Sequence, residues 1–229
     1  MAPPTLSRGE LLDRLYLTFS RYGYEGASMT RIAEATGLGK ASLYHHFPDG
    51  KREMAAAVLD HVQAWYEDFV FRPLAGVTPP RMRLSAMLEA LAKRYDTGGV
   101  TCLPALLAQT EERSMFAGAI SELFRRLIAS ITQTLCDAGL ARDIAQRRAH
   151  DGAVRIQGAL TLARALNDPR VYTMMAADLP DQLLAGADRS ALWTARGVPR
   201  FPAPPPIAVP ATAVNANKTT TPVPVPSAG

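Results

Sequence analysis

The sequence of 229 residues has only two cysteines, no long apolar run and almost no strand-forming pattern. The isolated thiols of Cys102 and Cys136 provide neither a disulfide framework nor the ligand spacing of a zinc site. No apolar run approaches the roughly 18 residues that a membrane-spanning helix needs, and no basic-then-apolar secretion signal begins the chain. We therefore expect a soluble, cytoplasmic protein without a metal ion or another cofactor.

Motifs of catalysis are also missing. The sequence contains neither G-x-S-x-G nor H-E-x-x-H, and no pair of carboxylates stands in a recognisable site. An enzyme is therefore not expected. The formal net charge of +4 permits a polyanionic partner but does not require one.

The apolar residues that are present recur at helical spacing, so the sequence predicts an all-α fold. Ser7 and Glu10 form the sequence pattern of a capping box before the first helix, and Gly23 suits its end. Pro73 and Pro180 are expected to end the helices that precede them. The last helix is expected to begin with Asp168 as its N-cap and Pro169 as its first residue. The predicted helices cover about 8–22, 28–37, 40–47, 51–72, 80–95, 103–109, 114–138, 142–166 and 169–179, with Gly98 and Gly99 closing the fifth.

The helical pattern divides the chain into two domains and a tail. Residues 6–51 hold an N-terminal three-helix domain, and residues 52–185 hold the longer helices. Residues 186–229 are rich in Ala, Pro and Thr and lack periodicity. Such a composition cannot bury enough apolar surface to offset the entropy of ordering, so we expect a disordered tail, with Trp193 as the one residue suited to docking.

The stretch RIAEATGLGKASLYHHF, residues 31–47, raises three possible functions. A phosphate-binding loop would need Gly where Glu34 stands and a hydroxyl where Ala41 stands, so this function is excluded. A metal pair is also excluded, because the adjacent His45 and His46 would point about 100° apart on a helix. We expect one of these imidazoles at the surface and the other packed against a neighbouring helix.

DNA recognition, the third function, fits the spacing of this stretch. A helix from Ser28, a turn at residues 37–39 and a helix from Lys40 form a helix-turn-helix pattern. An ordinary helical hairpin with a polar face is the alternative. Side chains that suit bases and phosphates lie on the outer face or open the helices. The predicted DNA-binding residues are Ser28, Thr30, Arg31, Lys40, Ala41, Ser42, Tyr44, His45 and Lys51.

The stretch SMTRIAEATGLGKASLYHHFPDGKREM resembles the N-terminal signature of TetR-family transcriptional regulators. FPDGK, GGVTCLPALLAQ and QGALTLARALNDPRVYTMMAADLP resemble the LmrA/YxaF-like branch of that family. Gly39 departs from the signature by replacing the usual Ser N-cap. The pair Asp49-Gly50 adds one residue before Lys51, so the resemblance gives weaker support to a phosphate contact by Lys51 than to the other matching positions. The matching positions are Ser28, Thr30, Ile32-Ala33, Gly37-Leu38, Leu43-Tyr44, His46-Phe47 and Lys51.

The resemblance implies that the second domain binds a small molecule and forms a homodimer. Plain core packing is the alternative for each large apolar residue, and polar contacts from Gln109, Arg155 or Gln157 stay open. Cys102 is expected to be a buried structural thiol rather than a redox sensor. The residues that suit an apolar pocket are Trp65, Phe69, Met82, Met87, Tyr95, Cys102, Leu106, Met115 and Phe116. The small residues that suit a close dimer interface are Gly152, Ala153, Gly158, Ala159 and Ala163.

Together these features predict a homodimeric repressor that a small hydrophobic effector releases from a palindromic operator. The helix that starts at Lys51 is the expected lever, because it begins beside the recognition helix and carries Trp65 and Phe69 at its far end. The effector must favour one of two conformations, since equal affinity for both would shift nothing. The alternatives are a ligand-independent DNA-binding protein and an enzyme with a fused DNA-binding head.

Overall fold

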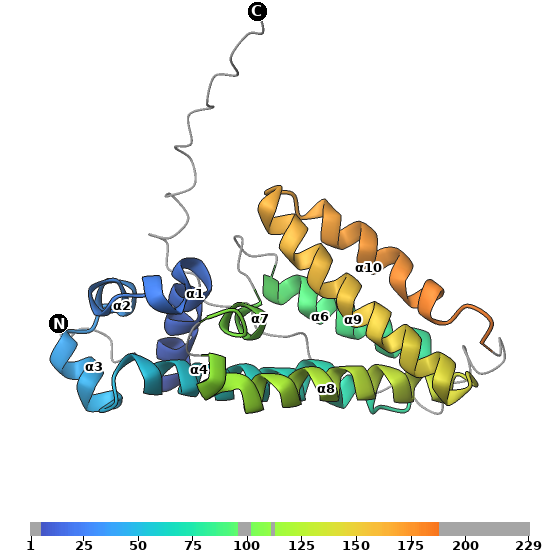
Figure 1. The fold of residues 1–229 in the computed structure, drawn as a ribbon, viewed down its shortest axis with the longest axis horizontal. Coiled ribbons are helices and arrows are strands. Elements are labelled where there is room, and N and C mark those ends of the chain that lie inside the picture. The colour runs from blue at the N-terminus through green and yellow to red at the C-terminus, as the bar shows by residue number, and fades with distance from the viewer. Residues whose placement is uncertain (1–5, 96–101, 111–112, 188–229) are drawn as a thin grey trace, which may run out of the picture.

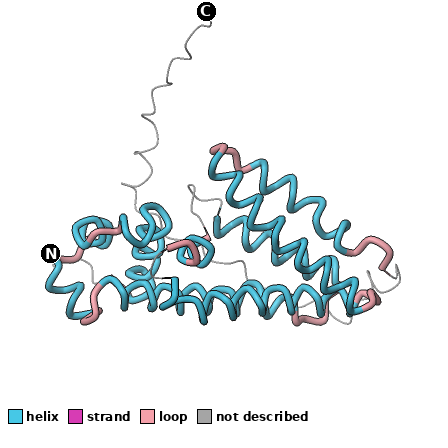
Figure 2. Tube along the Cα trace, in the orientation of Figure 1, coloured by secondary structure: helices cyan, strands magenta, loops and turns pink. Residues whose placement is uncertain are grey.

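The computed structural model describes residues 6–95, 102–110 and 113–187, and this part of the chain is helical without any strand (Figure 1). The all-α prediction is confirmed. Figure 2 shows that short loops join the helices. In chain order the elements are α1 (Arg8–Gly26), α2 (Met29–Thr36), α3 (Lys40–His46), α4 (Lys51–Tyr66), a π-helical turn (Glu67–Phe71), α5 (Arg72–Leu74), α6 (Pro80–Tyr95), α7 (Leu103–Leu107), α8 (Arg113–Asp137), α9 (Arg142–Ala165) and α10 (Arg170–Leu183).

The elements are arranged as an elongated body with the three short N-terminal helices at one end (Figure 1). Helices α4 and α8 run lengthwise and contact each other, so they connect this end to the rest of the molecule. Helices α9 and α10 form a packed pair, with α8 against α9 and α6 against α10. Helix α1 contacts α2, α4 and α7, and it therefore joins the N-terminal helices to the larger helical body.

The predicted helix caps at the N-terminal end are confirmed. The Ser7 amide donates to Glu10 Oε2 at 2.9 Å, and the Glu10 amide donates to Ser7 Oγ at 3.3 Å, which completes the capping box. Gly23 has φ of 72° and breaks α1, although one further helical turn follows it. Gly37 also has a left-handed conformation, with φ of 72°, at the end of α2.

Three expectations about proline and capping are wrong. The helical path does not stop before Pro73: α4 ends at Tyr66, and the π-helical turn after it leads into α5, where the missing N–H of Pro73 falls in the first turn. Helix α10 continues through Pro180 to Leu183. Arg81 holds this last turn through two hydrogen bonds to Asp181, at 2.7 and 2.9 Å. Asp168 precedes the N-cap residue, and its carboxylate accepts from the Arg170 amide at 2.9 Å.

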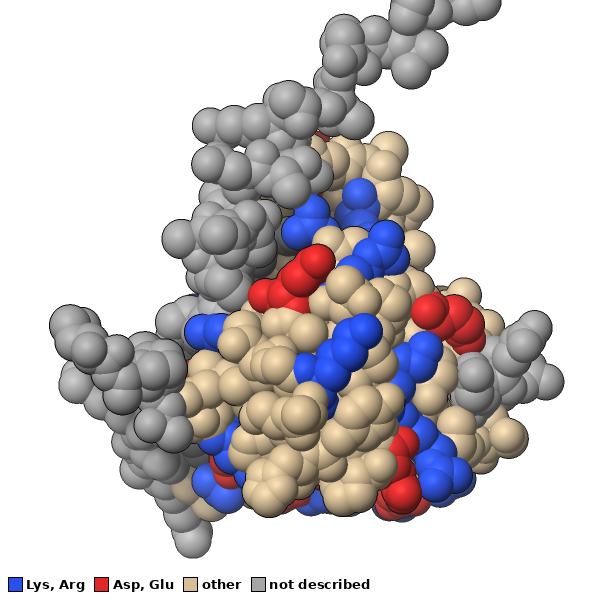
Figure 3. Space-filling model, turned by 90° about the vertical axis from the view of Figure 1, so that its left-hand side faces the viewer, with Lys and Arg blue, Asp and Glu red and all other residues tan. Residues whose placement is uncertain are grey.

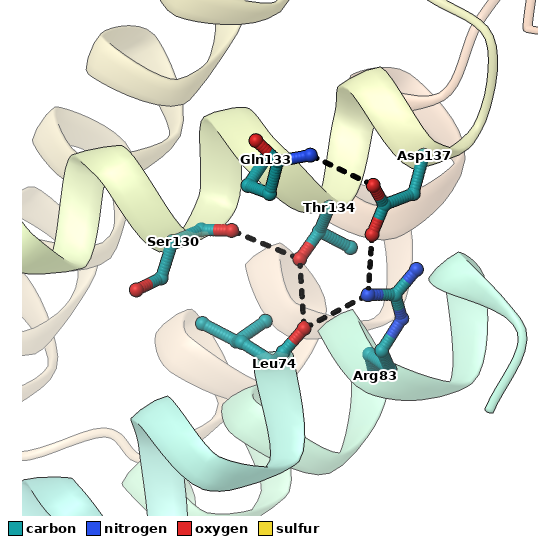
Figure 4. A network of polar contacts seen from close by, with 6 residues as sticks. All are labelled: Leu74, Arg83, Ser130, Gln133, Thr134 and Asp137. Atoms are coloured by element: carbon teal, nitrogen blue, oxygen red, sulfur yellow. Dashed lines mark hydrogen bonds and ion pairs between the residues drawn. The ribbon is translucent and has the colours of Figure 1, made fainter. Parts of the chain in front are cut away.

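A buried arginine, Arg83, takes part in a network of polar contacts near the C-terminal end of α8 (Figure 4). Arg83 Nη1 donates to the Leu74 carbonyl at 2.9 Å and to Asp137 Oδ2 at 2.8 Å. Thr134 Oγ1 also donates to the Leu74 carbonyl, at 3.3 Å. This network joins α5, α6 and α8, and it pairs a buried positive charge with a carboxylate, as burial of a charge requires.

Two sequence predictions lie outside the described residues, namely the helix closure at Gly98 and Gly99 and the tail from residue 188 onward. Within the described residues, no helix combines the length and the apolar character needed to span a membrane.

Candidate DNA-binding interface

The helix-turn-helix is built by α2, the Gly37 turn and α3. Ile32 of α2 and Leu43 of α3 are completely buried, so they join the two helices to the core. Arg14 of α1 donates through Nη1 to the Thr36 carbonyl at 2.9 Å. This hydrogen bond ties the C-terminal end of α2, next to the Gly37 turn, to α1.

Helix α3 presents an exposed face at the tip of the molecule. Lys40, Ala41, Tyr44 and His45 are exposed, and Ser42 is half-buried. The structure therefore brings the predicted recognition residues onto one accessible surface, while their contact with DNA stays a prediction. Figure 3 shows this end of the molecule, where basic side chains are spread over the surface, with acidic ones between them and much uncharged area.

The expectation that one of the two adjacent imidazoles is packed away is wrong. His45 and His46 are both exposed, and their ring centroids lie 5.9 Å apart. The short helix places both on its solvent side because Leu43 and Phe47 already occupy the buried side. Among the described residues no cluster of three or more His, Cys, Asp or Glu suits a metal ion.

The predicted contact residues around the start of α2 support the turn between α1 and α2. Ser28 Oγ accepts from the Arg31 amide at 3.3 Å, so Ser28 caps α2. The Arg31 guanidinium donates to the Gly26 carbonyl at 2.7 Å and lies 4.6 Å from the Tyr22 ring centroid. Ser28, Thr30 and Arg31 are all exposed, so they stay accessible to a phosphate backbone.

The Lys51 side chain makes contacts with another residue of its own chain. Its Nζ donates to the Tyr24 carbonyl at 2.9 Å and lies 4.4 Å from the Tyr24 ring centroid. The Tyr24 ring in turn packs edge-on against Phe116 of α8, with centroids 5.9 Å apart. Lys51 thus links the start of α4 to the end of α1, and any phosphate contact must share the ammonium with this carbonyl.

Gly50, the extra residue before Lys51, shapes the turn between α3 and α4. It has φ of 65° and ψ of −137°, and a Cβ there would lie 3.2 Å from Tyr44 Cε1. We expect Gly50→Ala to lower the free energy of unfolding by about 1–3 kcal/mol, because a side chain adds backbone strain and a close contact. Urea denaturation followed by circular dichroism measures this loss.

Gly39→Ser is the matched control, because Gly39 has φ of −67° and open space where a Cβ would stand. Serine is a preferred N-cap residue, so stability should stay within a few tenths of a kcal/mol of the wild type or rise. Equal stability of Gly50→Ala and the wild type would show that the turn tolerates a side chain.

The residues predicted for an apolar pocket fall into two groups. Trp65, Met87, Tyr95, Cys102 and Phe116 are buried, and Phe69 and Leu106 are partly buried. Met82 and Met115 instead lie at the surface, with 45% and 46% of their area exposed. The periodic pattern could not separate these groups, because both methionines occur in amphipathic helices.

One charged residue that the sequence analysis did not predict lies among the residues of the predicted pocket. Arg94 of α6 is buried, and its Cζ lies 4.4 Å from the Trp65 ring centroid and 4.6 Å from that of Tyr16. Arg94 continues the apolar row of Leu84, Leu88 and Leu91 at three- and four-residue steps. An arginine on such a row was the signal that could have revealed it.

Cys102 has the environment expected for a structural thiol. Burial raises the pKa of its thiol, and hydrogen bonds with the Ala105 backbone and with Tyr95 and Gln157 offset this only in part. A thiol with a raised pKa carries little thiolate at neutral pH, so it is a poor nucleophile. Of the three polar candidates, Gln157 reaches this cluster, while Arg155 bonds to Gln182 at the surface.

The small residues predicted for a dimer interface mostly face the interior of the same chain. Gly152 is buried, and a Cβ there would lie 3.3 Å from Leu183 of α10. Ala153 and Ala159 are also buried. Their small size therefore serves the close approach of α9 to its intrachain neighbours. Only Gly158 is exposed, and Ala163 is half-buried.

Four large apolar side chains on or beside α9 and α10 are exposed. They are Val154, Leu162, Leu166 and Met174, which are 71%, 53%, 65% and 70% exposed. We call these four residues the α9–α10 apolar face. Exposed apolar residues gathered on neighbouring helices are typical of protein–protein interfaces.

The profile described as "Bacterial regulatory proteins, tetR family" matches residues 11–58, which include the whole helix-turn-helix. The chain is 23% identical over 181 residues to the transcriptional regulator LmrA of Bacillus subtilis, covering 77% of this chain and 96% of LmrA. It is 22% identical to the uncharacterized regulator YxaF of the same organism, over 76% of this chain and 95% of YxaF. The helix-turn-helix of this chain is therefore that of the TetR family of transcriptional regulators, and the similarity to LmrA and YxaF extends over most of the chain.

Solved TetR-family structures share the fold. A TetR regulator from Legionella pneumophila superposes with a TM-score of 0.68 at 18% identity, over 80% of this chain and 99% of that protein. A cysteine mutant of the regulator CifR, solved with 26-bp operator DNA, superposes with a TM-score of 0.64 at 22% identity, over 78% and 97% of the two chains. These likenesses show that the chain shares the fold of these regulators, and the relatives and solved structures named above are described as transcriptional regulators.

Proposed function

We propose that this TetR-family regulator is a cytoplasmic homodimeric repressor that binds a palindromic operator through α3 and leaves it when an effector binds. The observation that carries the proposal is the exposed face of α3 on a buried helix-turn-helix scaffold. Residues 6–51 contain six basic and five acidic side chains, so their net charge is only +1. Placement of individual side chains, rather than total charge, is therefore the basis of recognition.

The recognition face supports a specific division of roles. Lys40 opens α3 and suits guanine acceptors or a phosphate. Tyr44 is 48% exposed, and its hydroxyl suits a phosphate oxygen. A phosphate contact carries no sequence information, whereas a base contact specifies one operator position.

We expect Lys40→Ala to weaken operator binding and to relax one operator position by about 1–3 kcal/mol. Tyr44→Phe should weaken binding to all sequences alike, because only a phosphate contact is lost. Fluorescence anisotropy with the operator and its single-base variants measures both effects. Lys93→Ala, which removes an exposed lysine from α6, is the control. Wild-type affinity in both α3 variants would show that another surface reads DNA.

The α9–α10 apolar face supports the dimer. Two copies related by a two-fold axis would cover the same face on both chains. The dimer must hold its two α3 helices at a spacing of about 34–36 Å, one turn of B-DNA, to read two half-sites.

The contacts of α1 and α4 support response to an effector. Helix α4 starts next to α3 and carries Trp65 near its end, while α1 packs on α2, α4 and α7. A molecule that binds beside Trp65 would therefore contact both elements that hold the helix-turn-helix. The test compares operator affinity with and without a compound found by thermal shift, and unchanged affinity would contradict the effector mechanism.

A further inference from the structure

Arg94 is a buried guanidinium without an acidic partner in the described part of the chain. Only 4% of its area is exposed, and its Nε and Nη2 have no hydrogen-bond partner there. A buried charge is costly unless it is paired and hydrogen-bonded. The Tyr16 and Trp65 rings on either side, at 4.6 and 4.4 Å, offset this cost only in part.

The two nitrogens of Arg94 without a described partner, Nε and Nη2, are the pair that suits a carboxylate. Nε and Nη2 present parallel N–H groups along one edge of the guanidinium, which binds the two oxygens of a carboxylate in a fork. Arg81 uses this same edge in this protein, with Nε and Nη2 at 2.7 and 2.9 Å from the Asp181 oxygens. Arg170 uses it for Asp168.

The groups around Arg94 add hydrogen-bond donors. The hydroxyls of Tyr16 and Ser20 are buried, and neither has a hydrogen-bond partner among the described residues, while the hydroxyls of Tyr66 and Tyr95 lie 3.2 Å apart. Burial raises the pKa of Tyr16 to about 12, although the Arg94 charge opposes this, and burial holds the pKa of Tyr66 and Tyr95 well above its usual value. These phenols are therefore protonated at neutral pH and can donate hydrogen bonds.

Arg83, the other buried arginine of α6, shows what a purely structural arginine looks like in this fold. Its Nη1 has a carbonyl and the Asp137 carboxylate as acceptors, so its charge is paired, although its Nε has no partner among the described residues (Figure 4). Arg94 lies on the same helix, but the groups described around its positive charge are hydroxyl donors and aromatic rings rather than a carboxylate. The Trp65 ring also packs against Phe69, with centroids 5.5 Å apart, so apolar surface adjoins the free guanidinium edge.

We propose that Arg94 binds the carboxylate of a small organic acid whose apolar part lies beside Trp65, with the Tyr16 hydroxyl as a further donor. The inference rests on the proposed function and deepens it, since it gives the chemical class of the effector. Tyr16 and Ser20 belong to α1, so the acid would contact the helix that anchors the helix-turn-helix directly. Bound acid would thereby influence the orientation of α2 and α3.

The test measures the binding of small organic acids to the full chain by isothermal titration calorimetry in the absence of DNA. The probes are monocarboxylates paired with neutral analogues, benzoate with benzamide and hexanoate with hexan-1-ol. Wild type should bind each acid at least about tenfold more tightly than its neutral analogue. Arg94→Gln should lose this preference. Arg81→Gln, which removes the same kind of side chain from a surface pair, should retain it.

Arg94→Lys keeps the positive charge but removes the two-pronged edge, so it is the second variant should Arg94→Gln fail to fold. It should reduce the acid preference at least about threefold. Equal binding of acids and neutral analogues by wild type, no binding by any acid, or full acid preference in the folded Arg94 variants would each overturn the inference. Because no DNA is present, these outcomes are separate from any failure of operator recognition.

Discussion

Replacing Val154 by Arg is expected to convert the proposed homodimer into a monomer and to abolish tight operator binding. Val154 is 71% exposed at the α9–α10 apolar face. A two-fold interface would place two such arginines, with their like charges, in a shared apolar contact. A monomer reads one half-site and loses about half of the specific binding free energy, so operator affinity should fall at least about 100-fold.

Sedimentation velocity gives the oligomeric state of this variant, and anisotropy with the operator gives its affinity. Val77→Arg is the matched control, because Val77 is 63% exposed but lies in the loop between α5 and α6. The control should remain a dimer and bind like wild type. A Val154→Arg protein that stays dimeric would place the interface on another surface.

Arg83→Met and Arg94→Met are expected to change stability very differently, although both remove a buried arginine from α6. Arg83→Met should lower the free energy of unfolding by about 3 kcal/mol, since Asp137 and the Leu74 carbonyl lose a charge-assisted partner. Arg94→Met should leave it unchanged or raise it by about 1 kcal/mol, because no carboxylate in the described part of the chain loses its partner when this buried charge disappears.

Urea denaturation of both variants and the wild type, without added ligand, measures this difference. A loss in Arg94→Met as large as that in Arg83→Met would mean that the aromatic rings of Tyr16 and Trp65 depend on Arg94 for packing. Arg94 would then be a structural residue, and the case for a carboxylate site would lose its main support.

Local signals were sufficient to predict the N-terminal helices. The capping box of Ser7, the helix start at Ser28 and the Gly37 turn each depend on a few neighbouring residues, and the structure confirms all three. Pro73 and Pro180 were misjudged for the opposite reason. Whether a helix continues through a proline depends on tertiary contacts, such as the Arg81 bonds to Asp181, which sequence spacing does not reveal.

The second domain shows where periodicity stops being informative. A small residue on a helix predicts close approach but not the identity of the neighbour, and Gly152 meets Leu183 of its own chain. Likewise, apolar residues at helical spacing do not show which side faces solvent, so Met82 and Met115 were placed in the interior. Arg94 escaped prediction because its aromatic neighbours come from α1 and α4, distant in sequence.

The central claim is that two copies of α3 read a symmetric DNA site. Selection of bound sequences from a random DNA pool, followed by sequencing, tests it most directly. We predict an inverted repeat whose half-site centres lie about one helical turn apart. We also predict that selection with Lys40→Ala loses preference at one position in each half-site. Enrichment of a site without two-fold symmetry, or of no sequence at all, would contradict the account.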